Sequence, residues 1–439
     1  MTTIPKILIF GQPLNNSTGG GITLTNLFKG WPMDKIAGMY VNYGYYRLTT
    51  DVCRTYYQLG NEEHKWKFPL NLVKQKNPSG LKSFDIKSGE SITYARPGLL
   101  LLASRFLFMV VDWLGLNNCN SVISISPKLK DWLSEYKPEI LYLQVSTREG
   151  ILFAIQLIDC LKIPSVIHMM DDWPSTISDH GPFKKFWEVR IDREFRQLLE
   201  RVDFHLSISD AMSEEYFKRY QKHFKAFHNP VEIEPYSMHG NKQRQANSFR
   251  ILYLGRIGTA NKESIILFAK VISQLKIDNQ RVELDIYSKD AEIPDLKQIS
   301  ELENVKLLPP VPYETVPGML KEYDLLFLPL DFTAKGLRFA RFSIPTKATE
   351  YMLSGTPVFV MAPEETAVNR FFKNNSCGFC VSSPKEEKIL EGIRFIIRNE
   401  EYRNQISRNA VNLAREKFDA TAVRQEFQNM LIDLSEKNL

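Results

Sequence analysis

A short stretch in the second half of the chain combines a cation and a carboxylate with the start of a helix. The segment SIPTKATEYMLSGTPVFV, residues 343–360, predicts a helix that begins at Pro345 and stops at Gly355, followed by an apolar strand. Proline fits the first helical position because its missing N–H costs nothing there, and glycine suits the left-handed position after a helix. Lys347 and Glu350 then lie one turn apart. Because a helix start offers unpaired N–H groups and about half a positive charge, this stretch predicts an anion site such as one for a diphosphate.

Glu350 is the unexpected member of this anion site, because a carboxylate repels phosphate. We expect it to face another part of the ligand, and a ribose diol is a natural partner since a carboxylate accepts two hydroxyl hydrogens. The alternative is an ion pair with Lys347 on one helix face, worth a few tenths of a kcal/mol. The preceding loop adds positive charge at Lys335, Arg338 and Arg341. The spacing alone leaves both interpretations of the carboxylate open.

A second pair of cations follows another predicted strand in the same half of the chain. In YLGRIGTANKES, residues 253–264, Arg256 comes directly after the strand and Lys262 opens the next helix. The carboxyl ends of parallel strands meet at one edge of a sheet, which is where ligands bind in such folds. One Arg and one Lys in a loop are usually only solvated, but two such clusters together favour a diphosphate site.

Three successive glycines follow the first predicted strand. The segment GQPLNNSTGGGITLTNLF, residues 11–28, places Gly20 and Gly21 in a loop before an amphipathic helix, and glycine lets the backbone approach a ligand closely. The spacing is not GxGxxG, and no acidic residue follows where an adenine-side ribose would need one. A nicotinamide-dependent oxidoreductase is therefore disfavoured. Glycines that only form a turn remain the alternative.

These loops belong to a series of short apolar runs separated by helical patterns. The runs are continuous and β-rich rather than alternating, which is typical of parallel strands covered on both faces. Strand–helix alternation predicts a doubly wound α/β architecture, and the series runs twice. The expected strands cover residues 6–11, 36–41, 139–144, 164–170 and 203–209 in the first half, and 250–255, 282–288, 305–311, 324–330 and 357–361 in the second.

The polar segment 228–248, which holds two prolines, separates the two series and is the predicted domain boundary. We expect a first domain over residues 1–230, a second over 231–418 and a C-terminal helix over 419–439 that returns to the first domain. Residues 43–95 are rich in Tyr, Lys and Asn and fit no α/β unit, so we interpret them as an insertion on the first domain. A chain of 439 residues also favours two domains.

Composition and charge exclude several classes of function. The formal net charge of +5 and the lack of a basic tail argue against an obligate nucleic-acid binder, and the five cysteines have no framework spacing, which favours a reducing compartment. We expect no signal peptide. The most apolar stretch, residues 96–116, contains Arg105 and Asp112. A core helix is therefore favoured over a membrane span, and a helix lying on a membrane surface is the intermediate option.

Three other groups of reactive residues have structural alternatives. Cys377 and Cys380 form CGFC without a second pair to complete a zinc site, and we expect them to be structural. His168 is either a core histidine or a site residue. Asp171 and Asp172 are adjacent, and neighbours on a strand point to opposite faces, so we expect no metal pair there.

Together these segments resemble a GT-B glycosyltransferase, and specifically glycosyltransferase family 4, the bacterial polysaccharide and lipopolysaccharide type. PTKATEYMLSGTPVFV resembles the family's Pro-x-Lys-x-x-Glu-Tyr-Met-x-x-Gly-x-Pro-Val signature, and LGR with Lys262 resembles the Gly-Arg and Lys that hold the donor diphosphate. VPYETVPGMLKEYDLLFLPL, DDWPS and SISDAMSEEY resemble further segments of the family. One position departs, because Phe342 stands where many members have an earlier glutamate. Ser343 and the backbone near Pro345 and Thr346 are expected to replace its contacts.

The resemblance implies two Rossmann-like domains facing a central cleft, with no cofactor and no metal, and with a nucleotide diphosphate sugar as donor substrate. It implies that Arg256 and Lys262 act on the diphosphate as catalytic groups, that Glu350 holds the ribose, and that Asp171 contacts a donor or acceptor hydroxyl. The donor-binding residues would be Gly20, Gly21, Arg256, Lys262, Ser343, Pro345, Thr346, Lys347 and Glu350.

The activity that the resemblance implies is that of a retaining, metal-independent hexosyltransferase. It would move a sugar from a nucleotide diphosphate sugar to a glycan or lipid-linked acceptor in cell-surface polysaccharide synthesis. The protein would be cytoplasmic, with peripheral contact at the inner face of the cell membrane and no nucleic-acid partner. A sugar-nucleotide epimerase of the same fold and a catalytically inactive scaffold remain alternatives.

Overall fold

The computed structural model divides the chain into two compact units. Unit 1 comprises residues 1–227 and 424–439, and unit 2 comprises residues 228–423. The sequence placed the corresponding boundaries after residues 230 and 418. The structure describes residues 4–41, 48–68, 71, 77–82, 109–176, 181–237, 248–275, 277, 280–290 and 294–436.

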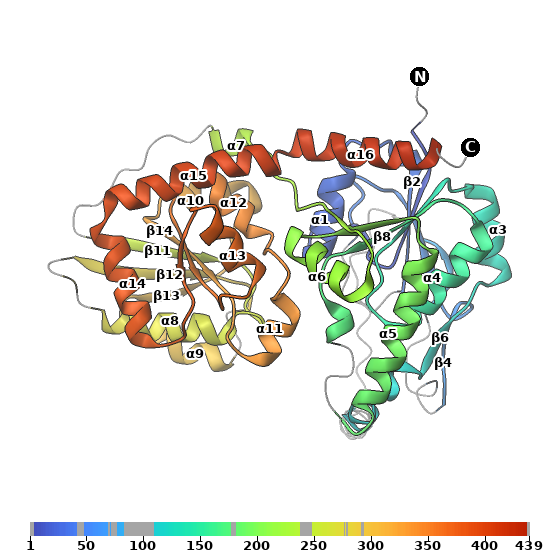
Figure 1. Ribbon diagram of the computed structural model, residues 1–439, viewed down its shortest axis with the longest axis horizontal. Helices are drawn as coiled ribbons and strands as arrows, with labels where there is room; N and C mark the ends of the chain where they lie inside the picture. Colours follow the sequence, from blue (N-terminus) through green and yellow to red (C-terminus); the bar gives the residue numbers. More distant parts are fainter. Residues whose placement is uncertain are drawn as a thin grey trace. The chain divides into compact units, whose positions relative to one another are not determined.

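Unit 1 is built on an eight-stranded sheet with strand order β10-β9-β8-β7-β1-β2-β3-β5. The described pairings are parallel except that of β5, which is antiparallel to β3. Its strands are β1 (Ile7–Phe10), β2 (Ile36–Val41), β3 (Thr55–Leu59), β5 (Gly80–Leu81), β7 (Ile140–Leu143), β8 (Ser165–Met169), β9 (Phe204–Ser207) and β10 (Lys225–Ala226). A separate antiparallel pair joins β4 (His64–Trp66) to β6 (Ser121–Ile123). Its helices are α1 (Gly19–Phe28), α3 (Pro127–Tyr136), α4 (Arg148–Leu161), α5 (Lys184–Arg201), α6 (Asp210–Tyr220) and most of α16 (Ala420–Glu436) (Figure 1).

Unit 2 is built on a six-stranded parallel sheet with strand order β13-β12-β11-β14-β15-β16. Its strands are β11 (Ser248–Leu254), β12 (Arg281–Tyr287), β13 (Val305–Leu308), β14 (Leu325–Pro329), β15 (Val358–Met361) and β16 (Phe379–Val381). Helices lie on both sides of this sheet (Figure 1). They are α7 (Glu234–Ser237), α8 (Lys262–Gln274), α9 (Pro294–Ser300), α10 (Val316–Lys321), α11 (Ala334–Ala340), α12 (Lys347–Ser354), α13 (Ala367–Asn374), α14 (Glu386–Arg398) and α15 (Glu400–Phe418).

The continuous apolar runs are explained by burial on both faces of the sheet. In β14, Leu325 and Phe327 pack into one hydrophobic cluster, whereas Leu326 and Leu328 pack into another. Successive side chains of a strand point to opposite faces, so each face of this strand is covered by helices. The prediction of a doubly wound α/β architecture is confirmed.

The strand order creates one reversal in each sheet. In unit 1 the chain moves from β1 to β2 and β3 on one side, and from β7 to β8 and β9 on the other. In unit 2 it moves from β11 to β12 and β13 on one side, and from β14 to β15 and β16 on the other. Ligands in such sheets bind beyond the carboxyl ends of the strands at the point where the direction reverses. The two reversal points, β1/β7 and β11/β14, are therefore where functional side chains are expected.

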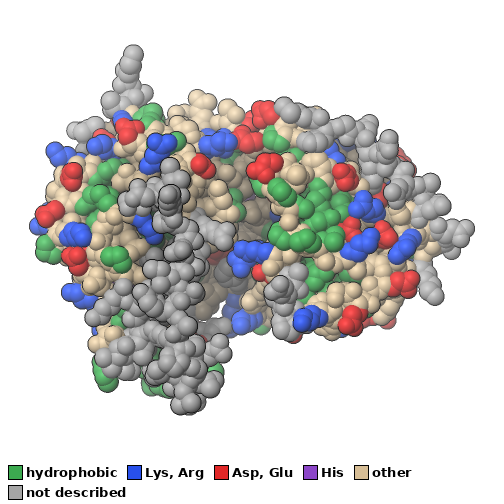
Figure 2. Space-filling view, turned by 180° about the vertical axis from the view of Figure 1, so that it is seen from behind, with side chains coloured by type: hydrophobic (Ala, Val, Ile, Leu, Met, Phe, Trp, Pro, Cys, Tyr) green, Lys and Arg blue, Asp and Glu red, His purple; other side chains and the backbone are tan. Residues whose placement is uncertain are grey.

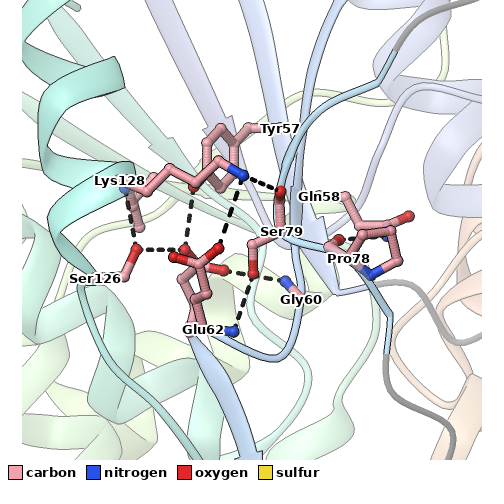
Figure 3. A network of polar contacts seen from close by, with 10 residues as sticks. Tyr57, Gln58, Gly60, Glu62, Pro78, Ser79, Ser126 and Lys128 are labelled. Atoms are coloured by element: carbon pink, nitrogen blue, oxygen red, sulfur yellow. Dashed lines mark hydrogen bonds and ion pairs between the residues drawn. The ribbon is translucent and has the colours of Figure 1, made fainter.

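All ten strands expected from the sequence are present, but the interpretation of residues 43–95 is partly wrong. Residues 55–59 form β3, which pairs in parallel with β2 as a full member of the sheet. Polar contacts also tie the segment to α3, because the Nζ of Lys128 donates to the carbonyl of Ser79 at 2.6 Å and pairs with Glu62 at 3.7 Å (Figure 3). The Tyr-rich composition of this strand concealed it.

The C-terminal helix α16 packs on unit 1. Phe427 is fully buried and contacts Phe28 and Phe227, with ring centroids 5.1 and 5.3 Å apart. The Nε of Arg424 donates to the carbonyl of Asn26 at 2.7 Å.

Over the face shown in Figure 2, basic and acidic side chains are interspersed rather than gathered into one field.

Candidate functional site

The candidate site lies where the neighbouring strands β11 and β14 end. The chain leaves β11 through Gly255, whose φ of 140° lies in the region that favours glycine. A Cβ at Gly255 would lie 2.6 Å from the Nζ of Lys347. The glycine therefore lets the ammonium group of Lys347, which belongs to the start of α12, reach the end of β11.

Lys347 is partly buried and has no carboxylate partner. Its Nζ donates to the hydroxyl of Tyr253 at 2.9 Å and lies 4.1 Å from the centre of that ring. No ion pair joins it to an Asp or Glu of the described chain. Burial lowers the pKa of Lys347 from 10.5 to about 7, against a smaller opposing effect of Glu350. A partly buried cation without a carboxylate in contact is destabilising, and an anionic ligand would supply a closer counter-charge.

Tyr253 fixes the position of this ammonium group. The side chain is fully buried, and its hydroxyl donates to the carbonyl of Arg256 at 2.5 Å and accepts from the Nδ2 of Asn261 at 2.9 Å. Burial raises the pKa of Tyr253 well above its ordinary value, so the hydroxyl stays protonated. The hydrogen bonds from Lys347 to Tyr253 and onward to Arg256 tie α12 to the loop after β11.

Glu350 does not pair with Lys347. Its Oε1 accepts a hydrogen bond from the hydroxyl of Tyr313 at 2.8 Å, and no ion pair joins the two helix residues, so the alternative of a pair within the helix is wrong. Burial raises the pKa of Glu350, while Tyr313 and Lys347 lower it. Tyr313 is itself 65% exposed. The carboxylate therefore accepts a hydroxyl hydrogen from an exposed side chain, which is the kind of interaction that a ribose diol would also make.

The start of α12 is left without a side-chain cap. Thr346 is its N-cap residue and makes no side-chain hydrogen bond to the helix. The N–H of Ala348 donates to the carbonyl of Pro345 at 2.8 Å, so Pro345 lies before the helix and not in its first position as expected. Gly355 ends the helix with a φ of 76°, as predicted. The first N–H groups of α12 are therefore suited to an anion.

Arg256 and Lys262 both have carboxylate partners, and of these only Glu263 was evident from the sequence. The Nζ of Lys262 pairs with Asp295 and, at 3.2 Å, with Glu263. The Arg256 side chain is 68% exposed and lies 3.9 Å from Asp290. A bound diphosphate would compete with these carboxylates for Lys262 and Arg256, whereas Lys347 has no such competitor.

The start of α8 already holds a carboxylate. Asp331 is buried after β14 and accepts hydrogen bonds from the N–H groups of Ser264 at 2.8 Å and Glu263 at 3.3 Å. Burial raises the pKa of Asp331, and these two N–H groups oppose that effect. The positive end of α8 is thus occupied by Asp331, while that of α12 is not capped by a side chain.

The segment before α12 adds unpaired positive charge. Lys335, Arg338 and Arg341 are exposed on and directly after α11, and none of them forms an ion pair with a carboxylate of the described residues. Ser343 follows, with its N–H donating to the carbonyl that ends α11 at 3.2 Å. These cations favour an anionic ligand near Lys347.

In unit 1 the glycines form a helix and not the expected loop. Gly20 and Gly21 lie in the first turn of α1, which begins at Gly19 and is capped by Thr18, whose Oγ1 accepts from the N–H of Gly21 at 3.2 Å. A Cβ on Gly21 would lie 2.2 Å from the Nδ2 of Asn15. Packing against Asn15 therefore requires Gly21.

The two adjacent aspartates lie in different environments. Asp172 is buried and accepts from the hydroxyl of Tyr216 at 3.0 Å and from two nitrogens of Arg219 at 3.0 and 2.9 Å, which makes it structural. Asp171 is partly exposed beyond the end of β8. His168 is fully buried with its Nδ1 2.5 Å from a tyrosine hydroxyl, as in a core histidine.

Within the described part of the chain, no group of His, Cys, Asp or Glu side chains is arranged to hold a metal ion. Cys377 and Cys380 are free thiols, and burial raises the pKa of both. Their burial and raised pKa values fit a structural role.

Sequence reasoning missed three residues of the site, namely Tyr253, Tyr313 and Asp331. Tyr253 and Tyr313 stand in segments that were singled out, but no spacing rule brings a strand residue and a loop residue to the same helix. One signal could have identified Tyr253 as a site residue, namely that an aromatic side chain with a hydroxyl group stands just before the glycine that ends a strand. For Asp331 it was an acidic residue directly after β14, where the sheet reverses.

Comparisons with known proteins concern the fold of the whole chain and the family of its second half. Residues 238–413 match the model of a family described as glycosyl transferases group 1. Anabaena Alr3699/HepE, solved in complex with UDP-glucose, is 13% identical over 97% of this chain and 99% of that one, with a TM-score of 0.61. Sucrose-phosphate synthase from Thermosynechococcus elongatus is 11% identical over 98% and 99% of the two chains, with a TM-score of 0.64. WaaG, a glycosyltransferase involved in lipopolysaccharide biosynthesis, is 12% identical over 97% and 99%, with a TM-score of 0.55.

A search of curated protein sequences returns no match. The similarity to these structures shows the GT-B fold, with two Rossmann-like domains, and the family match identifies a glycosyltransferase group 1 domain at residues 238–413.

Glu350→Gln is expected to weaken UDP binding while leaving the melting temperature unchanged. The two side chains have nearly the same shape, but a charge-assisted hydrogen bond is about twice as strong as a neutral one. Calorimetric titration with UDP and a thermal melt on the same sample measure both quantities. Glu322→Gln, an exposed change at the end of α10, is the matched control. An unchanged Kd for UDP in the Glu350 variant would mean that the carboxylate is structural.

Proposed function

We propose that this protein is a retaining glycosyltransferase that moves a sugar from a nucleotide diphosphate sugar to a glycan or lipid-linked acceptor in cell-surface polysaccharide synthesis. The fold and the group 1 domain support a glycosyltransferase. The observation that carries the donor class is the partly buried Lys347, whose ammonium group contacts a tyrosine hydroxyl and forms no ion pair with a carboxylate of the described residues.

The roles follow from position and charge. A diphosphate at the start of α12 would accept hydrogen bonds from the uncapped N–H groups of the helix and from the ammonium group of Lys347. Ser343, Pro345 and Thr346 would form the backbone before the helix. Glu350 would exchange the hydroxyl of Tyr313 for those of the ribose.

The departing diphosphate gains negative charge as the sugar leaves. Donors and cations fixed in place stabilise such charge without reorganising, and this is usually the largest single catalytic contribution. Lys347 is held by Tyr253 and needs no movement, whereas Lys262 would leave Asp295 and Arg256 would leave Asp290. Lys262 and Arg256 would then act on the diphosphate in the transition state more than in the ground state.

We further propose that the reaction needs no metal ion. The support is the set of cations around the start of α12, which can neutralise a diphosphate directly. Turnover that persists in excess EDTA would agree with this, and strict dependence on added Mg²⁺ or Mn²⁺ would overturn it.

Arg256→Ala and Lys262→Ala are each expected to lower turnover far more than stability. Removing one charge-stabilising donor typically costs about 2.7–4 kcal/mol of barrier, or roughly 10²–10³ in rate. The folded state loses little, because both cations lie at the surface, where solvent screens their ion pairs. Initial rates with a nucleotide sugar, with melting temperatures, test this. Lys306→Ala, an exposed cation on β13, is the control.

Near-normal rates in both variants would remove these two residues from the diphosphate site. Loss of activity together with a large fall in melting temperature would instead assign them to the fold.

We also propose peripheral contact with the cytoplasmic face of a membrane. No helix within the described ranges is long and apolar enough to cross a bilayer. Most of the apolar stretch 96–116 lies outside the described residues, but Met109 and Trp113 at its end are 64% and 55% exposed, and so are Phe183 and Phe186 near the start of α5, at 50% and 52%. A Cβ at Gly181 would lie 1.8 Å from the carbonyl of Trp113, so the two segments are neighbours.

High-salt or carbonate washing is expected to release the protein from membranes, because a surface contact depends on charge and on exposed aromatics rather than on a buried span. Immunoblots of pellet and supernatant measure the release. Retention in the pellet after both treatments would argue against a peripheral contact.

A further inference from the structure

The carboxylate of Glu350 is bonded to a side chain that stands far from it in the sequence. Glu350 lies in the first turn of α12, and its Oε1 accepts a hydrogen bond from the hydroxyl of Tyr313 at 2.8 Å. Tyr313 opens a single turn of 3-10 helix, Tyr313–Thr315, between β13 and α10. Its side chain is 65% exposed. The hydroxyl that reaches Glu350 therefore belongs to a residue with room to turn into solvent.

The backbone that carries Tyr313 has little freedom to move. Pro312 comes directly before it with a φ of −57°, and proline fixes this angle. The carbonyl of Pro312 accepts from the N–H of Thr315 at 3.1 Å and from its Oγ1 at 2.8 Å. Pro317 is buried in the first turn of α10. The hydroxyl can thus leave Glu350 by rotation of the Tyr313 side chain, and the segment itself need not move.

The hydrogen bond from Tyr313 opposes any ligand that uses the same carboxylate oxygen. A ribose hydroxyl bound to Glu350 would replace it, so the free energy of this bond is subtracted from the free energy of binding. The bond is charge-assisted and therefore stronger than one between neutral groups. Because the phenol is exposed, water can satisfy its hydroxyl after displacement. The contact therefore weakens binding at Glu350 without preventing it.

A second tyrosine near this carboxylate makes no such bond. Tyr236, on α7, is 5% exposed, and its hydroxyl has no hydrogen-bond partner among the described residues. Helix α10 contacts α7, α12 and the turn of Tyr313, so all three belong to one cluster (Figure 1). Burial raises the pKa of Tyr236, and the nearby charge of Glu350 adds to this effect. Of these two tyrosines, Tyr313 is the one hydrogen-bonded to Glu350.

We propose that Tyr313 competes with the nucleotide for Glu350 and so speeds the release of the nucleotide diphosphate after sugar transfer. This inference rests on the proposed function, because it requires a ribose at Glu350. The nucleotide diphosphate has to leave before the next donor binds, and product release limits the rate of many enzymes. As the ribose separates from Glu350, the hydroxyl of Tyr313 returns, so the carboxylate is not left without a partner.

The main variant is Tyr313→Phe, which removes the hydroxyl and keeps the ring. Its affinity for the nucleotide is expected to rise about three- to tenfold, the effect of losing one competing hydrogen bond. Most differences in affinity between related complexes lie in the dissociation rate, so we expect slower release. Tyr236→Phe is the matched control, because it makes the same change in a neighbouring tyrosine that is not bonded to Glu350. Its affinity for the nucleotide is expected to equal that of the wild type.

The probes are UDP, GDP, ADP and CDP, titrated by calorimetry on the full chain, and stopped-flow measurements follow dissociation of the nucleotide that binds most tightly. Inorganic pyrophosphate is the second probe, because it matches the diphosphate and has no ribose. Tyr313→Phe is expected to leave the affinity for pyrophosphate unchanged. Combined with Glu350→Gln, it is expected to give a smaller rise in nucleotide affinity, because the bond to a neutral acceptor is weaker.

Three results would overturn the proposal. The first is nucleotide binding by Tyr313→Phe that is equal to or weaker than that of the wild type. The second is an equal rise in affinity for pyrophosphate, and the third is the same rise in Tyr236→Phe, since neither effect would pass through Glu350. If none of the four nucleotides binds to either protein, the proposed function fails and the competition fails with it. Equal binding by both proteins removes the competition alone and leaves the proposed function standing.

Discussion

The candidate site of unit 2 depends on one constraint. An ammonium group that forms no ion pair with a carboxylate of the described residues is held at the end of β11. Gly255 makes room for it, Tyr253 supplies both a hydroxyl and a ring face, and the start of α12 carries it. Below pH 7 Lys347 is charged in the folded and the unfolded chain, and the full cost of burial is present. Between about pH 7 and 10.5 the unfolded chain binds more protons at this group, so its contribution to stability rises with pH. A bound anion would remove this cost at neutral pH, which is why the arrangement is suited to a diphosphate.

The two units use the same topology with different chemistry. In unit 2 the strands at the reversal point end beside a cation and an uncapped helix start, which suit an anion. In unit 1 they end beside the amide side chains of Gln12 and Gln144 and a helix start rich in glycine, and none of these residues carries a charge. The nature of the ligand is thus set by a few side chains after the strands, and the sheets only bring those side chains together.

The sequence predicted most of the architecture, because buried parallel strands leave continuous apolar runs. It also predicted the stop of α12 at Gly355 from the need for a left-handed residue. It did not predict β3, whose tyrosines are buried in the sheet, because the segment 43–95 is rich in Tyr, Lys and Asn and fitted no α/β unit. The length and order of the strands and helices follow from local sequence patterns, and these two properties were predicted most reliably.

The contacts of the site were harder to predict, because they join residues far apart in sequence. The residues next to Lys262 in the sequence suggested that it was available to a ligand, yet it pairs with Asp295, which belongs to a separate helix. Glu350 seemed able to pair with Lys347, yet each found a tyrosine from another element.

The most direct test of the central claim is the number of protons taken up when UDP binds at pH 8.5. Calorimetric titrations in two buffers of different ionisation enthalpy measure it. With a pKa of about 7, Lys347 is mostly neutral at this pH, and a bound diphosphate should restore its charge. We expect uptake of roughly one proton in the wild type and none in Lys347→Met. Tight binding of UDP to the wild type with no proton uptake would contradict it.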